Sequence, residues 1–182
     1  MYLDIPRPLR SLVNFLLQIK QYFLAAASLV MAFVFFFVVI LRYWFQTDLF
    51  AYEEWVLMLA FWVYFLGGAM GSYENTHVKA DFLLSVMEDP RKKWLVVNFT
   101  IFLEVLIGLV LSYWGWLMVE EEVVAYPSWQ RTTGLELPFF IPKLGIFLGF
   151  VFMTFYTALH FYSGLRAGPS EVWEDNETPP HI

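Results

Sequence analysis

The chain has 182 residues, of which 59% are hydrophobic, 21% aromatic and only 15% charged, with a net charge of −6. Soluble domains average roughly 45–50% apolar and about 25% charged residues, so this composition is typical of an integral membrane protein. The sequence contains no cysteine, which excludes disulfides, thiolate metal sites and thiol catalysis, and it has no segment basic enough to bind nucleic acid.

Residues 1–22 place basic side chains among leucines at helical spacing. This pattern predicts either an interfacial amphipathic helix, lying among lipid headgroups, or a helix that continues into the first span. The first span is predicted at residues 23–44. Its uncharged part, Phe23 to Leu41, would be about 28 Å long as a helix, close to the roughly 30 Å of hydrocarbon in a bilayer.

Three further spans are predicted, at residues 53–72, 94–119 and 139–162. Pro142 lies in the first turn of the last span, where a missing backbone N–H costs least. We therefore expect an all-α integral membrane protein with one four-helix domain over residues 1–165. The acidic tail at residues 166–182 has a composition typical of disorder.

An even number of spans places both termini on the same side of the membrane. Eight Lys and Arg fall on that side, and three fall in the two loops of the opposite side. Because Lys and Arg accumulate in the cytoplasmic segments of membrane proteins, the sequence predicts that both termini are cytoplasmic. The eight are Arg7, Arg10, Lys20, Lys79, Arg91, Lys92, Lys93 and Arg166, and the three are Arg42, Arg131 and Lys143.

Glu104 lies near the middle of the third predicted span. A carboxylate at this depth costs about 3 kcal/mol or more unless it is protonated, paired or hydrated. Thr100, Gly108, Ser112 and Gly115 form a stripe of small or polar residues with it, which predicts that this face meets protein and not lipid. The residue is interpreted either as a proton or ion relay or as a hydrogen-bonded group that holds helices together. The second role is favoured because a relay needs another ionisable group at the same depth.

The link between the first two spans is short enough for Arg42 to form an ion pair with Glu53 or Glu54. The alternative is that these charges are solvated separately at the membrane surface, where such a pair is worth only about 0–1 kcal/mol.

Two pairs of glycines have the spacing G-x-x-x-G, Gly67 with Gly71 and Gly145 with Gly149. This spacing lets helices approach closely, and we expect the neighbouring helix to belong to the same chain, with a partner chain as the alternative.

His77 and His160 are both predicted near the cytoplasmic boundary. Two facing histidines can ligate haem, which would make the chain a haem- or quinone-binding membrane anchor of an oxidoreductase. A capping or loop hydrogen bond is the favoured role. The sequence shows no catalytic triad, phosphate-binding loop or metal cluster, so an enzyme is not expected.

Four short motifs follow one another between positions 42 and 81: Arg42-Tyr43, Glu53-Glu54-Trp55, Trp62-Val63-Tyr64-Phe65-Leu66-Gly67 and His77-Val78-Lys79-Ala80-Asp81. In this order and at these places relative to the spans, they resemble the small membrane subunit (DctQ-like) of tripartite ATP-independent periplasmic (TRAP) transporters. The chain departs from the family pattern at Tyr73-Glu74, where a basic residue is common.

The resemblance implies a multi-pass protein of the bacterial inner membrane that is not an enzyme and has no cofactor of its own. In such systems a periplasmic binding protein captures an organic acid or related solute, and a large membrane subunit carries it inward with sodium ions. The small subunit packs against the large one as part of a fixed frame. The implied partners are therefore the large subunit, the periplasmic solute-binding protein and membrane lipids.

Two groups of residues are expected to serve these contacts. The expected subunit-interface or structural residues are Arg42, Glu53, Glu54, Trp55, Trp62, Gly67, His77, Asp81 and Glu104. Those expected to meet a docked binding protein are Glu120, Glu121, Glu122, Trp129 and Arg131.

Overall fold

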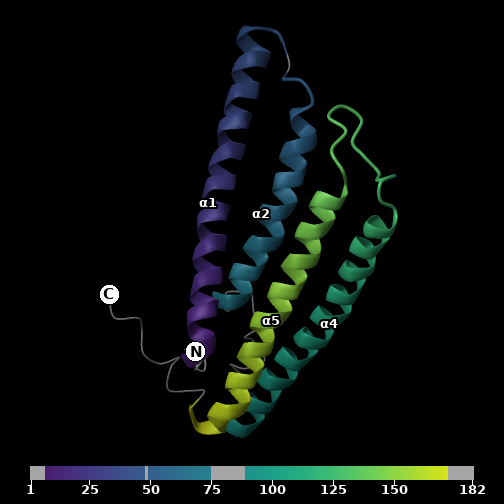
Figure 1. Ribbon diagram of the computed structural model, residues 1–182. Helices are drawn as coiled ribbons and strands as arrows, with labels where there is room; N and C mark the ends of the chain where they lie inside the picture. Colours follow the sequence, from purple (N-terminus) through teal and green to yellow (C-terminus); the bar gives the residue numbers. More distant parts are fainter. Residues whose placement is uncertain (1–6, 48, 75–88, 172–182) are drawn as a thin grey trace.

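The computed structural model describes residues 7–47, 49–74 and 89–171 of the chain. These residues form four long helices, α1 (Arg7–Trp44), α2 (Tyr52–Glu74), α4 (Pro90–Val124) and α5 (Phe140–Glu171) (Figure 1). Each helix contains a stretch that is long and apolar enough to cross a membrane. The structure thus confirms the predicted class, an all-α protein with four candidate spans.

Helix α1 is continuous from Arg7, so residues ahead of the first predicted span extend that span. Pro8 lies in its first turn, and no glycine or later proline interrupts the helix. Of the two alternatives for the start of the chain, the structure therefore shows the continuing helix, which is about 57 Å long over its 38 residues.

The last two helices also extend past the predicted spans. Asp89 caps α4, its side chain accepting a hydrogen bond from the Arg91 amide at 3.0 Å, and Pro90 occupies the first helical position. Helix α5 runs into the predicted tail, and Gly168, with a φ of 75°, interrupts its regular geometry. The tail beyond Glu171 lies outside the described residues.

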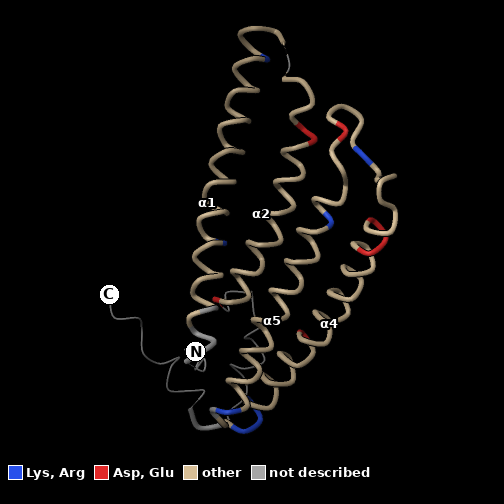
Figure 2. Tube along the Cα trace, viewed as in Figure 1, with Lys and Arg blue, Asp and Glu red and all other residues tan. Residues whose placement is uncertain are grey.

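The helices lie side by side in a row and do not follow chain order. Helix α4 packs along α5, α5 along α2, and α2 along α1 (Figure 1). We call the end of the row with residues 45–51 and 125–139 the loop end, and the end where α1 begins and α5 finishes the terminal end. Most acidic residues lie at the loop end, together with Arg42, Arg131 and Lys143, and the other basic residues of α4 and α5 lie at the terminal end (Figure 2).

The contact between α4 and α5 has the spacing of a coiled coil. Buried and half-buried residues of α4 recur at alternating intervals of three and four, at Asn98, Ile101, Val105, Gly108, Ser112, Gly115, Val119 and Glu122. Small residues in this seam bring the helices together, because Gly108 lies against Thr154 and Gly115 against Phe147. The hydroxyls of Ser112 and Thr154 are 3.2 Å apart and share a hydrogen bond.

The contact between α2 and α5 places aromatic rings over glycines. A Cβ at Gly145 would meet the Trp62 ring at 3.0 Å, and one at Gly149 would meet the Phe65 Cβ at 2.5 Å and its backbone carbonyl at 3.1 Å. The Trp62 indole N–H donates to the Ile141 carbonyl oxygen at 3.0 Å. The glycine pair of α5 therefore serves a contact within this chain.

Candidate functional site

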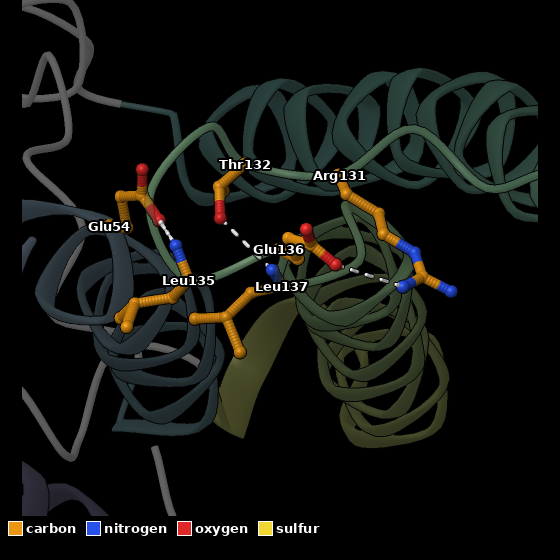
Figure 3. A network of polar contacts seen from close by, with 6 residues as sticks. All are labelled: Glu54, Arg131, Thr132, Leu135, Glu136 and Leu137. Carbon is orange, nitrogen blue, oxygen red and sulfur yellow. Dashed lines mark hydrogen bonds and ion pairs between the residues drawn. The ribbon is translucent and has the colours of Figure 1, made fainter.

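The loop between α4 and α5 folds back on itself at the loop end (Figure 3). An isolated β-bridge joins Arg131 to Pro138, and the Thr132 amide donates to the Leu137 carbonyl oxygen at 2.9 Å. The Leu137 amide donates in turn to the Thr132 hydroxyl oxygen at 3.0 Å. On the exposed side, Arg131 lies 3.7 Å from the Glu136 carboxylate. These bonds give the loop a defined shape.

Glu54, in the first turn of α2, holds this loop in place (Figure 3). Its two carboxylate oxygens accept hydrogen bonds from the Gly134 amide at 2.7 Å and the Leu135 amide at 2.8 Å. A Cβ at Gly134 would lie 2.9 Å from the Ala51 Cβ and 3.0 Å from a Glu54 oxygen, so the approach requires glycine.

Glu54, one of the two predicted ion-pair partners of Arg42, directs both carboxylate oxygens to amides of the loop. Backbone amides of the folded loop bind the Glu54 carboxylate, because the N–H groups of Gly134 and Leu135 are placed to donate one hydrogen bond to each of its two oxygens. Arg42, in the last turn of α1, and Glu53 are both exposed. Sequence reasoning missed this partner because the donors are backbone groups eighty positions away.

The three consecutive glutamates at the end of α4 differ in how far they are buried. Glu120 and Glu121 are exposed, whereas Glu122 is 4% exposed and pairs with Lys143 of α5, with 2.5 Å between Lys143 Nζ and Glu122 Oε1. The Trp129 indole N–H donates to the Glu122 carbonyl oxygen at 2.9 Å. Of these predicted docking residues, Glu122 and Trp129 are therefore engaged inside the chain, and Glu120 and Glu121 face outward.

At the terminal end, a lysine is buried in an aromatic cage. Lys20 of α1 is 4% exposed, and its ammonium donates to the Tyr156 hydroxyl of α5 at 2.5 Å. The Lys20 nitrogen also lies 4.1 Å from the centre of the Tyr156 ring and 4.6 Å from that of Phe152, distances at which cation–π attraction applies. Val13 of α1 and Ala69 of α2 complete the fully buried cluster around Tyr156.

Lys20 is one of the basic residues that the sequence assigns to the cytoplasmic side, and its burial was not predicted. The signal was its register, because Val13, Lys20 and Ala27 are spaced by seven and all three are buried. Lys20 therefore lies on the face of α1 that packs against the other helices.

His160 is buried near the same cluster, and its Nε2 lies 2.9 Å from the Tyr73 carbonyl oxygen at the end of α2. This contact gives the imidazole a structural role between α5 and α2, as the hydrogen-bond interpretation predicts. His77, the other histidine of the haem alternative, lies outside the described residues, as does Asp81.

The stripe around Glu104 does not face one neighbour. Gly108, Ser112 and Gly115 contact α5, but Glu104 and Thr100 are exposed. The prediction that the whole stripe meets protein therefore fails within this chain at Glu104. The reason is geometric, because Glu104 lies one position before the seam and at the edge of the contact surface.

The remaining predicted residues are parts of α2. Trp55 is half-buried in its first turn, and Trp62 contacts α5. Gly67 is half-buried, but no described atom lies within 4 Å of a Cβ built on it.

Comparison with models of known protein families assigns the chain to a family. The family model described as "Tripartite ATP-independent periplasmic transporters, DctQ component" matches residues 31–167, from the middle of α1 to the end of α5. The chain belongs to the DctQ family. The DctQ component is a multi-pass protein of the inner membrane and part of a transporter, not an enzyme. A search of curated proteins finds no match. The resemblance carried by the motifs between positions 42 and 81 is thus confirmed over most of the chain.

Proposed function

We propose that this DctQ chain is the non-transporting frame of a sodium-coupled TRAP transporter. A periplasmic binding protein delivers an organic acid or a related solute, and a large membrane component carries it inward together with sodium ions. The DctQ chain binds the large component and holds it at a fixed depth and orientation in the membrane.

The observation that carries this proposal is the row of helices. Helices α4, α5, α2 and α1 lie side by side, and at the terminal end α1 also meets α5 around Tyr156, so the described helices form a layer in which neighbours pack directly on one another (Figure 1). Solute sites in secondary transporters lie near the membrane midplane, between repeats and at broken helices. α1, α2 and α4 cross the span region unbroken, and the interruption of α5 comes only at Gly168. Such a layer supports another subunit better than it encloses a solute.

The loop end supports a second contact, with the binding protein. Glu54 and the bonds inside the 125–139 loop hold this loop in one shape, and Glu120, Glu121 and Arg131 point away from the helices. A preformed surface loses little conformational freedom when a partner binds. We therefore place the binding-protein contact on the exposed charges of the loop end.

This arrangement requires the loop end to be periplasmic and the basic terminal end to be cytoplasmic, in agreement with the positive-inside rule. The absence of cysteine allows a direct test, because single cysteines can be introduced without removing others. Ser128→Cys at the loop end should react with a membrane-impermeant maleimide in intact cells, and Lys92→Cys at the terminal end only after permeabilisation. The unmodified chain should not react at all. The reverse pattern would refute the orientation and the docking site.

The transport role is tested in liposomes with a sodium gradient. The chain together with the large component and the binding protein should take up solute, whereas the chain alone should not, even with the binding protein present. Sodium-dependent uptake by the chain alone would refute the frame role. Failure of the large component to co-purify with the chain would refute the assembly itself.

A further inference from the structure

Glu104 is embedded deeply in the span of α4. It lies ten positions after Trp94, whose indole N–H donates to the Gly164 carbonyl oxygen at the terminal end, and sixteen before the exposed Glu120 at the loop end. At 1.5 Å per residue these separations are about 15 Å and about 24 Å along the helix. Glu104 is therefore well inside the roughly 30 Å of hydrocarbon.

The charged side chains that are buried within the described residues have partners inside the chain, whereas the exposed Glu104 does not. Lys20 has the Tyr156 hydroxyl and two aromatic rings, and Glu122 has Lys143. Over residues 7–47, 49–74 and 89–171, no hydrogen bond or ion pair reaches Glu104, and its side chain is exposed. An isolated carboxylate at this depth is unfavourable unless it is protonated, paired or hydrated.

The exposed residues beside Glu104 do not provide a hydrogen-bond donor for its carboxylate. Thr100, one turn earlier, donates its hydroxyl to the Val96 carbonyl oxygen of its own helix at 3.0 Å. Ile107, on the following turn, is 60% exposed and apolar. We call the surface formed by Thr100, Glu104 and Ile107 the Glu104 face.

We propose that the Glu104 face is the contact surface of α4 for a helix of the large membrane component, and that this helix carries a Lys or Arg donor at the same depth. The inference rests on the proposed function for the identity of the partner. Charge complementarity selects the occupant: lipid tails have no donor, whereas an ionised carboxylate at this depth is stabilised by pairing with a cationic side chain.

A second copy of the chain does not fit this requirement. The exposed basic side chains of the described helices and loops lie towards their ends, at Arg42, Arg91, Lys92, Arg131 and Arg166. None of these is at the depth of Glu104. A symmetric pair would instead bring two Glu104 carboxylates together, and like charges at one site disfavour each other.

Crosslinking in the intact complex tests the proposal. Ile107→Cys and Leu109→Cys place single cysteines at sites that are 60% and 54% exposed and two residues apart. They differ by about 200° of rotation around the helix, so they have similar depth but opposite directions. With a benzophenone maleimide attached, position 107 should crosslink to the large component and position 109 should not. Crosslinks between two copies of the chain, or equal yields at both positions, would overturn the proposal.

Substitutions of Glu104 provide the second measurement. Glu104→Leu should reduce co-purification of the large component roughly three- to twentyfold, the range measured for polar contacts between membrane helices, while Glu104→Gln, which keeps a hydrogen-bonding group, should retain more of it. Both variants should be as abundant in the membrane as the wild type, because the side chain is exposed in the chain itself. An unchanged yield with Glu104→Leu would overturn the proposal. Loss of the wild-type complex would instead count against the proposed function.

Discussion

The two ends of the helix row are held together by different chemistry. At the terminal end, side chains that are fully or nearly fully buried join α1 to α5, through Lys20, Tyr156 and Val13. At the loop end, Glu54 binds backbone amides of a loop that water can reach. Removing a group from a tightly packed core leaves a cavity, whereas water can replace a lost partner at the surface. The comparison therefore predicts that global stability depends mainly on the terminal end and that the loop end controls local shape.

Tyr156→Ala should have the largest effect. Tyr156 is 0% exposed and belongs to the buried cluster with Val13 and Ala69, so its loss should lower the free energy of unfolding by about 3–5 kcal/mol, as for other buried aromatic residues. Thermal unfolding of the purified protein in detergent measures this. Tyr162→Ala, on the same helix at a site that is 53% exposed, is the control and should be close to wild type. Equal losses in the two variants would contradict the comparison.

Gly149→Ala should come next, in the middle of the row between the two ends. The added Cβ would lie 2.5 Å from the Phe65 Cβ and 3.1 Å from its backbone, which should cost about 1–3 kcal/mol through forced separation of α2 and α5. Gly67→Ala is the matched control, because apart from the adjacent residues and backbone of its own helix no described atom lies within 4 Å of the new methyl group. Unfolding in a graded detergent series should separate the two variants, and a greater loss for Gly67→Ala would refute this packing.

Glu54→Ala should have a smaller and more local effect, because two loop amides exchange a carboxylate for water. Hydrogen exchange should accelerate at Gly134 and Leu135 while the midpoint of unfolding changes little. Glu53→Ala, at the exposed neighbouring position, should leave exchange in the loop unchanged. A large drop in global stability would show that the loop end is not the weaker of the two.

The smallest effect is expected for Arg131→Ala. The Arg131 and Glu136 side chains are 51% and 76% exposed and lie 3.7 Å apart, so their ion pair should contribute less than about 0.5 kcal/mol. A double-mutant cycle with Glu136→Ala, measured at low and high salt, checks this. A coupling above about 1 kcal/mol would mean that the loop is more rigid than its exposure implies.

The helices themselves were predictable from the sequence because long apolar runs and end signals are local. Asp89 and Pro90 are local signals for the start of α4 that the predicted span at 94–119 did not use, and the glycine pair of α5 correctly indicated a close contact. The order of the helices in the row was not predictable. In a membrane, an apolar helix surface can pack against any other helix or against lipid, so the sequence does not specify which helices are neighbours.

Among the polar residues, too, some positions could be predicted from the sequence and others could not. The partner of Glu54 is a pair of backbone amides, which no side-chain pattern records. The spacing of Lys20 with Val13 and Ala27, seven residues each, indicated that Lys20 lies on the buried face of α1. The prediction instead used its positive charge, which favoured the membrane surface. Glu104 is exposed because it lies one position before Val105, which belongs to the seam between α4 and α5. The sequence alone does not show which of these two positions faces α5.

The length of α1 has a further consequence. At about 57 Å it is nearly twice as long as the hydrocarbon is thick, and in its loop-end half the side chains of Phe33, Phe36 and Phe37 are exposed. Such a rod can change its tilt without disturbing the α4–α5 seam, and tilting is how a long helix relieves hydrophobic mismatch. We therefore expect α1 to adapt to bilayers of different thickness by tilting about the Lys20–Tyr156 contact.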